Sequence, residues 1–247
     1  MMDFSSEDLF LITGASSGIG RSTAAAVIAQ GGSVIACARN RAKLEELKRE
    51  CRAPERLFIE PRDLAEDIAG LPKWLKEISA RYGKLRGMVC GAGTARINPL
   101  RSIDLDELKK LFDLNYFAPI FLAKGFADFR VHAPGDCSVV MIGSVSALRS
   151  DKGHLEYSGT KAALISSAIA IGRELAEKRI RVNCVSPSNV RTPLTEASGE
   201  QYLQEQATNY PFGIGEAEDV SNMIAFLLSA KAKWITCQNY VIDCGSK

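Results

Sequence analysis

The chain has 247 residues, of which 46% are hydrophobic and 24% are charged, as is typical of a globular protein. Its formal net charge of +2 is too small to favour nucleic acid or a membrane surface, so we expect neither as a partner. Because the sequence has no run of about 18 apolar residues, we also expect no transmembrane helix.

Short apolar runs alternate with longer helical patterns along the whole chain. Several of these runs are almost continuously apolar, which is typical of parallel strands covered on both faces. The predicted strands are residues 9–12, 33–38, 57–59, 87–90, 138–142, 182–185 and 240–242. The predicted helices are residues 19–30, 41–50, 64–82, 104–129, 156–178 and 216–229. Pro72 and Pro119 are expected to kink or restart two of these helices.

This alternation predicts an α/β fold. We expect a single domain over residues 1–247, with a Rossmann-type, doubly wound sheet of seven parallel strands and helices on both faces. The longest irregular stretch, residues 187–215, is rich in proline and glycine and has a short polar helical piece near 200–207. Loops this long often cover or bind a ligand, so we interpret it as a substrate loop; the alternative is a plain surface excursion.

A glycine-rich turn joins the first predicted strand to the first helix, and its sequence is TGASSGIG. Gly14 allows the tight turn, Gly18 lets the backbone approach a pyrophosphate, and Gly20 lets the helix pack closely on the strand. The free N–H groups at the helix start favour phosphates. Although the spacing differs from GxGxxG, the strand–turn–helix context predicts a dinucleotide site. The predicted contacts here are Gly14, Ser16, Ser17, Gly18, Ile19 and Gly20.

The end of the second predicted strand indicates which dinucleotide binds. It reads Ala38-Arg39-Asn40-Arg41, without the acidic residue that would hold the ribose hydroxyls of NAD. A carboxylate about 4 Å from a 2′-phosphate would cost about 4 kcal/mol at an effective dielectric of about 20. Arg39 instead can form a forked pair with that phosphate. We therefore expect NADP(H), with Arg39, Asn40 and a hydroxyl of Ser16 or Ser17 in the site.

Asp63 and Leu64 follow the third predicted strand, at the edge where the adenine ring of a dinucleotide would lie. We expect both residues to contact the cofactor. The alternative for Asp63 is a helix N-cap, and the two roles are compatible.

Tyr157 and Lys161 are four positions apart on a predicted helix and therefore share one face. A free phenol has a pKa of about 10, and a neighbouring cation lowers that pKa by favouring the phenolate. The pair is therefore a candidate proton donor or acceptor.

The N-terminus and the cysteines predict a cytoplasmic location. Asp3, Glu7 and Asp8 occupy the region where a secretory signal would have basic and apolar residues. The seven cysteines are scattered without a Cys-x-x-Cys spacing, and we interpret them as reduced, mostly buried thiols. With only two histidines in the chain, we expect no metal site.

Taken in order, these residues resemble the pattern of the short-chain dehydrogenase/reductase family over nearly the whole chain. The resemblance rests on Thr13-Gly14-x-x-x-Gly18-x-Gly20, Asp63-Leu64, Asn115, Ser144, Tyr157-x-x-x-Lys161 and Pro187 through Thr192-Pro193. The part from Pro211 to Asp243 is similar to the 3-oxoacyl-[acyl-carrier-protein] reductase branch. Three positions depart from the family pattern: Cys90-Gly91 replaces two asparagines, and Ser188 and Cys244 each replace a glycine.

The resemblance implies NADPH-dependent reduction of a carbonyl to a secondary alcohol. Tyr157 would be the proton donor, its pKa lowered by Lys161, and Ser144 would donate a hydrogen bond to the same substrate oxygen. Lys161 would also hold the nicotinamide ribose, and Asn115 would hold a water that relays protons to Lys161. The alternatives are a helix kink for Asn115 and a strand end for Ser144. Further implied cofactor contacts are Gly91, Ala92, Gly93, Tyr157, Lys161, Val190 and Thr192.

The substrate stays open at this level. A 3-oxoacyl thioester or similar ketone is the first expectation, and a sugar, polyol or other secondary alcohol is the alternative. A cofactor-binding regulator or scaffold is the alternative outside enzymes. Residues 95–100, 147–155 and 187–215 are expected to shape the pocket. We expect His154 to be either exposed or a substrate contact rather than a catalytic group. The resemblance also implies a homotetramer, or a homodimer, built through the helices of Asn115 and Tyr157.

Overall fold

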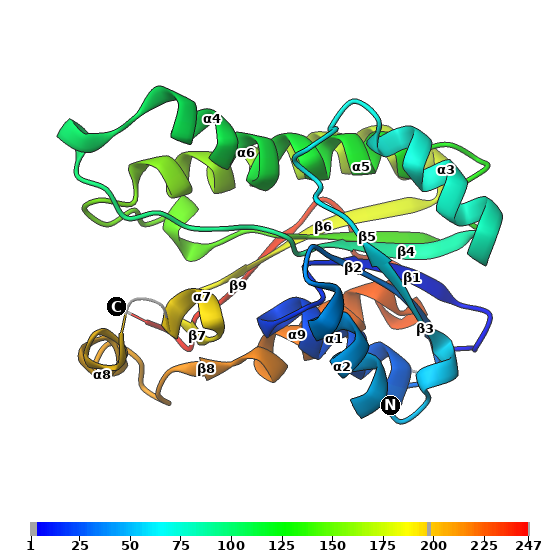
Figure 1. Cartoon of the computed structure of the whole chain (residues 1–247), viewed down its shortest axis with the longest axis horizontal. Coiled ribbons are helices and arrows are strands. Elements are labelled where there is room, and N and C mark those ends of the chain that lie inside the picture. The colour runs from blue at the N-terminus through cyan, green and yellow to red at the C-terminus, as the bar shows by residue number, and fades with distance from the viewer. Residues whose placement is uncertain (1–3, 197–198, 247) are drawn as a thin grey trace.

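A computed structural model describes residues 4–196 and 199–246 of the chain. Its centre is a seven-stranded parallel sheet with the strand order β3-β2-β1-β4-β5-β6-β9 (Figure 1). The strands are β1 (Leu9–Thr13), β2 (Ser33–Ala38), β3 (Leu57–Pro61), β4 (Leu85–Cys90), β5 (Cys137–Ile142), β6 (Ile180–Pro187) and β9 (Asn239–Ile242). The predicted doubly wound sheet of seven parallel strands is therefore confirmed.

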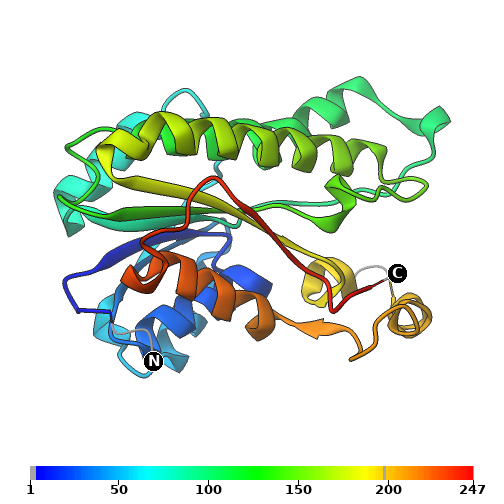
Figure 2. The same ribbon diagram turned by 180° about the vertical axis from the view of Figure 1, so that it is seen from behind.

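Helices cover both faces of the sheet, as the continuously apolar strands predicted. On one face lie α1 (Gly18–Ala29), α2 (Arg41–Glu50) and α9 (Ala217–Leu228); on the other lie α3 (Leu71–Tyr82), α4 (Leu105–Phe112), α5 (Ala118–Phe126) and α6 (Leu155–Leu175) (Figure 2). Short 3₁₀ turns lie at Pro54–Arg56, Leu100–Ser102, Val145–Ala147, Ala176–Lys178 and Ala230–Ala232.

Successive strand residues enter two separate apolar clusters because side chains alternate between the faces of a sheet. Leu11 and Met88 pack with the helices of the α3, α5 and α6 layer. Phe10 and Val89 pack with the α1, α2 and α9 layer. The sheet is thus buried on both sides, and the carboxyl ends of its strands are left to form a site.

Two of the six predicted helices are divided or shortened in the structure. The helix predicted over 64–82 begins only at Leu71, because residues 64–70 form turns and Pro72 lies in the first helical turn. The helix predicted over 104–129 consists of α4, a π-helical turn at Asp113–Phe117 and α5. Pro119 lies in the first turn of α5, which confirms the expected restart.

The stretch 187–215 is closed at its base by a two-stranded parallel sheet that the sequence analysis missed. Its strands are β7 (Val190–Arg191) and β8 (Gly215–Glu216), and two-residue strands are too short to give a periodic signal. Between them lie α7 (Pro193–Glu196) and α8 (Glu200–Ala207). The helical piece expected near 200–207 is confirmed, while positions 197 and 198 of the predicted loop lie outside the described residues.

No helix within 4–196 and 199–246 is long and apolar enough to cross a membrane. The same ranges hold no group of three or more His, Cys, Asp or Glu side chains arranged to bind a metal ion. All seven cysteines are free thiols, and four of them, Cys37, Cys90, Cys137 and Cys184, are buried in the sheet.

Candidate active site

A cavity of about 1520 Å³ lies at the carboxyl ends of the strands. It is lined by the segments that follow β1, β2, β3, β4, β5, β6 and β9, which places it where open α/β sheets bind their ligands. All but one of the predicted site residues line it; Asn115 is the exception. Those lining it are Gly14, Ser16, Ser17, Gly18, Ile19, Gly20, Arg39, Asn40, Asp63, Leu64, Gly91, Ala92, Gly93, Ser144, Tyr157, Lys161, Val190 and Thr192.

The glycine turn forms a tight cradle at one end of this cavity. Gly14 has φ +72°, and a Cβ there would lie 2.6 Å from the carbonyl oxygen of Gly91. Gly18 has φ +51°, and its Cβ would lie 3.0 Å from Cγ2 of Thr192. Ser17 is the N-cap residue of α1, but its side chain makes no capping hydrogen bond. The first N–H groups of α1 are therefore available to an anion, and the cradle fits the phosphates of a dinucleotide.

Charged side chains mark the end of the cavity formed after β2 and β3. Nη1 of Arg39 lies 3.7 Å from Oδ2 of Asp63, and the Arg39 side chain is 76% exposed. Oδ1 of Asp63 accepts the backbone N–H of Ala65 at 3.0 Å. Asp63 thus stabilises a turn, and the expectation that it caps a helix is wrong because α3 starts eight residues later, at Leu71.

The sequence analysis missed Arg62, a second guanidinium at this end of the cavity. Arg62 lines the cavity, and its Cζ lies 5.1 Å from the ring centroid of Trp74. Its buried Nε has no hydrogen-bond partner among the described residues. The sequence could have indicated Arg62 because it directly precedes Asp63, and an arginine that follows β3 also reaches the carboxyl edge of the sheet.

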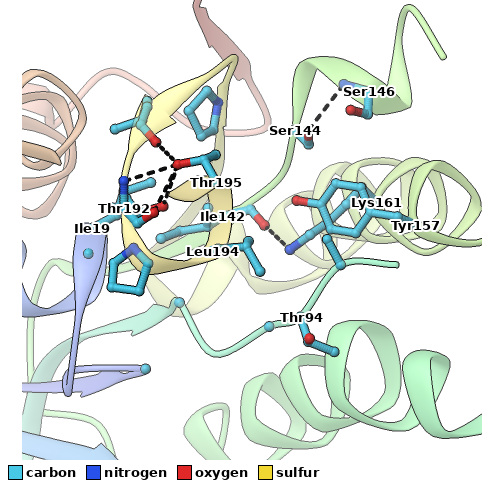
Figure 3. A pocket seen from close by; sticks show the side chains of 18 of the residues that line it. Ile19, Thr94, Ile142, Ser144, Ser146, Tyr157, Lys161, Thr192, Leu194 and Thr195 are labelled. Atoms are coloured by element: carbon cyan, nitrogen blue, oxygen red, sulfur yellow. Dashed lines mark hydrogen bonds between the residues drawn. The ribbon is translucent and has the colours of Figure 1, made fainter. Parts of the chain in front are cut away.

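Ser144, Tyr157 and Lys161 meet at the other end of the cavity. Ser144 follows β5, and its Oγ accepts the backbone N–H of Ser146 at 3.1 Å. Tyr157 and Lys161 both come from the first half of α6. Figure 3 shows the Tyr157 hydroxyl directed into the space between Ser144 and the Lys161 ammonium. Nζ of Lys161 donates to the carbonyl oxygen of Ile142 at 2.7 Å.

Burial dominates the proton affinities of this group. It raises the pKa of the Tyr157 phenol, and the hydrogen-bonding hydroxyl of Ser144 acts in the opposite direction. Burial lowers the pKa of Lys161 to about 8, against the opposing effect of the Cys184 and Cys90 thiols. The expected lowering of the Tyr157 pKa by Lys161 is not seen. Nζ lies 5.8 Å from the ring centroid and is directed to Ile142 rather than to the phenol oxygen.

Asn115 lies behind the cavity wall, in the π-helical turn between α4 and α5. Its Oδ1 accepts the backbone N–H of Thr94 at 3.0 Å, and its Nδ2 donates to the carbonyl oxygen of Thr94 at 2.8 Å. Nδ2 also lies 3.2 Å from Oγ1 of Thr160 on α6. The side chain therefore fastens the segment of Gly93 and Thr94 to the helix that carries Tyr157 and Lys161.

The structure describes all three positions that depart from the family pattern. Where Cys90-Gly91 replaces two asparagines, Oγ1 of Thr13 accepts the N–H groups of Gly91 at 3.1 Å and Ala92 at 3.3 Å and joins β1 to β4. Cys244 has φ +56°, a left-handed conformation that favours glycine. The third departure, Ser188, places a hydroxyl group in the cavity wall.

His154 lines the cavity and is half-buried, and a contact with the substrate stays a prediction. Arg149, which belongs to the segment 147–155 expected to shape the pocket, also lines the cavity. Nη1 of Arg149 donates to the carbonyl oxygen of Ser246 at 2.7 Å, and its guanidinium pairs with Asp243. The C-terminal segment thus forms part of the cavity wall.

A dinucleotide cradle, a buried lysine and a tyrosine beside a serine define a nicotinamide-dependent oxidoreductase acting on alcohol or carbonyl groups. The family model described as "Enoyl-(Acyl carrier protein) reductase" matches residues 14–247. The chain belongs to the short-chain dehydrogenase/reductase family, as the resemblance predicted. Proteins of this family bind NAD or NADP.

Similar proteins span almost the whole chain. D-erythrulose reductase of Gallus gallus is 31% identical over 238 residues, covering 95% of this chain and 94% of its own. The 3-oxoacyl-[acyl-carrier-protein] reductase FabG of Salmonella typhimurium is 29% identical over 238 residues and covers 95% of each chain. A short-chain dehydrogenase described as a glucose/ribitol dehydrogenase, from Brucella melitensis, superposes with a TM-score of 0.91 at 27% identity, covering 99% of this chain and 98% of its own.

Proposed function

We propose that this protein uses NADPH to reduce a ketone to a secondary alcohol, with Tyr157 as the proton donor. The observation that carries the proposal is the meeting of Tyr157, Ser144 and Lys161 in one cavity with the glycine cradle. The names of two relatives, a D-erythrulose reductase and a 3-oxoacyl-[acyl-carrier-protein] reductase, support reduction of a ketone. Their names are also compatible with both expected substrates, an oxoacyl thioester and a sugar-like ketone.

When bound, NADPH supplies the hydride that reaches the carbonyl carbon. Tyr157 then meets the negative charge that develops on the carbonyl oxygen by donating its phenolic proton. The raised pKa keeps the phenol protonated before the reaction, as a proton donor requires. Ser144 donates a hydrogen bond to the same oxygen and so stabilises the charge that develops there.

Lys161 is proposed to hold the nicotinamide ribose and to restore the proton of Tyr157. With a pKa of about 8, its ammonium can lose and regain a proton close to neutral pH. The proposed part of Asn115 is to position this group, because its side chain ties Gly93 and Thr94 to α6. A water held at the π turn and relaying protons to Lys161 stays a prediction.

We propose NADPH rather than NADH on the charges at the far end of the cavity. Two guanidinium groups, Arg39 and Arg62, line this end with one carboxylate, Asp63. The pair between Arg39 and Asp63 is long and exposed, so it competes weakly with a phosphate that both arginines can approach. Ser16 and Ser17 line the same end and add hydroxyl donors.

The test of the chemistry is Tyr157→Phe, which removes only the phenolic oxygen. We expect turnover to fall by about a thousandfold or more, because the proton donor is lost, while the NADPH dissociation constant stays unchanged. Initial rates of NADPH oxidation with ketoacyl thioesters, keto-sugars and diketones would be compared with fluorescence titrations of NADPH. Wild-type turnover that survives in the variant would exclude Tyr157. A wild-type chain that binds NADPH but reduces no member of the panel would favour the regulator or scaffold.

We further propose a single domain that assembles as a homotetramer through the layer of α4 and α6. Leu105 and Leu155 are 63% and 52% exposed on these helices, and Phe117 in the π turn is 41% exposed. Burying such side chains against another copy would release apolar surface from water. Sedimentation equilibrium at micromolar concentration tests the proposal, and a stable monomer would contradict it.

A further inference from the structure

Ser188 and Tyr210 form a hydroxyl pair in the wall of the cavity that holds Tyr157. Ser188 follows β6, and Tyr210 lies beyond α8 in the 187–215 stretch. The two hydroxyl oxygens are 2.7 Å apart, and Tyr210 is only 9% exposed. Both side chains line the cavity, although neither belongs to the proton-transfer group.

The hydrogen bonds of the pair leave one O–H donor unused. The backbone N–H of Asn189 lies 3.4 Å from the Tyr210 hydroxyl oxygen and donates to it. If Tyr210 donates to Ser188, the Ser188 O–H has no acceptor among the described residues; if Ser188 donates to Tyr210, the Tyr210 O–H has none. In both arrangements the pair presents one free O–H to the cavity. Ser188 is half-buried, and the free O–H faces the cavity, where water can accept from it. A ligand that displaces this water must offer an oxygen in its place or leave the O–H without an acceptor.

Hydrogen bonds to the sheet hold the Ser188 side of the pair, so the position of the pair does not depend on the 187–215 stretch alone. The Ser188 N–H donates to the carbonyl oxygen of Ile242 in β9 at 3.0 Å. The Gly215 N–H donates to the carbonyl oxygen of Asn189 at 3.3 Å, beside the β7–β8 pairing. The donor is therefore positioned before any ligand arrives, which suits selective recognition.

The surroundings of the pair are polar as well. Nδ2 of Asn189 and Nδ2 of Asn209 each lie 3.4 Å from Oε1 of Gln206, and all three amides line the cavity. An extended alkyl group against this wall would desolvate amides and a hydroxyl without replacing their hydrogen bonds. The wall is thus suited to a substrate portion that carries oxygen.

We propose that Ser188 and Tyr210 are a specificity-determining pair that donates a hydrogen bond to a second oxygen atom of the substrate. Ser188 follows β6, which pairs with the strand β5 that leads to Ser144, so this end of the wall lies beside the proton-transfer group. This inference rests on the proposed ketone reduction. The required chemistry is a ketone with a hydroxyl or a second carbonyl oxygen a few bonds away, as in hydroxyketones and in 3-oxoacyl thioesters. A plain alkyl ketone that displaces water from the pair leaves its free O–H without an acceptor, and sites of this kind discriminate against analogues that lack the matching group.

The test compares three ketones on the wild type and on the double variant Ser188→Ala/Tyr210→Phe. Hydroxyacetone and butanone differ only by a hydroxyl in place of a methyl group, and an acetoacetyl thioester of N-acetylcysteamine supplies the second carbonyl. We expect kcat/KM of the double variant to fall about tenfold for at least one oxygen-bearing ketone and to stay unchanged for butanone. A fall for hydroxyacetone indicates that the pair binds a hydroxyl oxygen, and a fall for the acetoacetyl thioester indicates that it binds a second carbonyl oxygen.

Each single variant keeps one hydroxyl that can donate, so Ser188→Ala and Tyr210→Phe alone should lose less than the double variant. The matched control is Ser167→Ala/Tyr116→Phe, which removes a similar pair with hydroxyl oxygens 3.1 Å apart from positions outside the cavity lining. This control should leave the preference between the ketones unchanged. If the double variant does not fold, as judged by circular dichroism and thermal unfolding, Ser188→Gly/Tyr210→Phe takes its place.

The outcomes separate the two proposals. Unchanged relative kcat/KM values in the double variant, with an active wild type, overturn the inference and leave ketone reduction standing. A larger NADPH dissociation constant with an unchanged preference between the ketones means that the free O–H faces the cofactor. This outcome also overturns the inference. A wild type that reduces none of the three ketones, and none of the wider panel, overturns the proposed function and this inference with it.

Discussion

The two ends of the cavity are built in different ways. The cofactor end is made largely of backbone, since Gly14 and Gly18 bring the turn close to Gly91 and Thr192 and leave the first N–H groups of α1 open. The opposite end is made of side chains that arrive from β5, α6, β6 and the 187–215 stretch. The difference suggests that the first end is fixed by geometry that few residues can supply, while the second can change its chemistry one side chain at a time.

The largest expected effect comes from filling the cradle. Gly14→Ala puts a Cβ at 2.6 Å from the Gly91 carbonyl oxygen at φ +72°, so the turn or β4 must shift. We expect the NADPH dissociation constant to rise about a hundredfold, equivalent to about 3 kcal/mol. Isothermal titration of NADPH measures it. The matched control is Gly213→Ala in the substrate stretch, where φ is +84° but no atom lies within 4 Å of the added Cβ. Equal losses in both variants would refute a special role for the cradle.

The second effect concerns how the folding stability of the protein depends on pH through Lys161, which lies at the substrate end of the cavity. Burial lowers the pKa of Lys161 from 10.5 to about 8, so charging it costs the folded state about 3 kcal/mol. Between about pH 8 and pH 10.5 the unfolded chain holds more protons at this side chain than the folded chain, so the contribution of Lys161 to stability rises with pH through that window. The thiols of Cys37, Cys90 and Cys184, whose pKa burial raises to about 12, act in the opposite direction above about pH 9 and are common to both proteins compared. Lys161→Met should abolish this rise. Urea denaturation of both proteins at several pH values tests it, and parallel pH profiles would contradict it.

The third effect separates the two nicotinamide cofactors. Arg39→Ala should weaken NADPH binding by about 2 kcal/mol, about thirtyfold, because a charge-assisted hydrogen bond to the 2′-phosphate is lost. NADH binding should change little. Arg41→Ala is the control, since Arg41 is also exposed but lies outside the cavity lining and pairs with Glu45. Wild-type protein that binds NADH more tightly than NADPH would overturn the assignment of Arg39.

Much of the fold could be predicted because its signals are local. Continuously apolar runs identified seven strands, and the TGASSGIG turn could be placed on the first strand and helix without knowledge of distant residues. The turns at 64–70 were taken for helix because their polar and apolar residues imitate a helical pattern until Pro72. The β7–β8 pair was missed because it depends on the meeting of residues 25 positions apart, such as Val190 and Gly215.

Only part of the site could be predicted from the sequence, because some of its contacts join residues that are distant along the chain. The positions of Tyr157, Lys161 and Ser144 follow from spacing and resemblance, but the direction of the Lys161 ammonium follows from packing. Its bond to the Ile142 carbonyl oxygen involves a strand that spacing along α6 cannot reveal. The contact between Ser188 and Tyr210 likewise joins residues 22 positions apart across an irregular stretch. Such pairs become visible only when the chain is folded.

The short β7–β8 pairing also bears on how this protein could change over evolutionary time. Because Val190 and Gly215 stand side by side, the chain between them begins and ends at fixed points on the body of the molecule. The entropy of closing such a loop grows slowly, by about 0.6 kcal/mol for each doubling of its length. Thr192 packs against Gly18, but insertions, deletions and new side chains in the part that follows α7 impose little on the sheet or on the glycine cradle. The sheet and the glycine cradle can therefore stay constant while the segment between β7 and β8 changes in length and sequence.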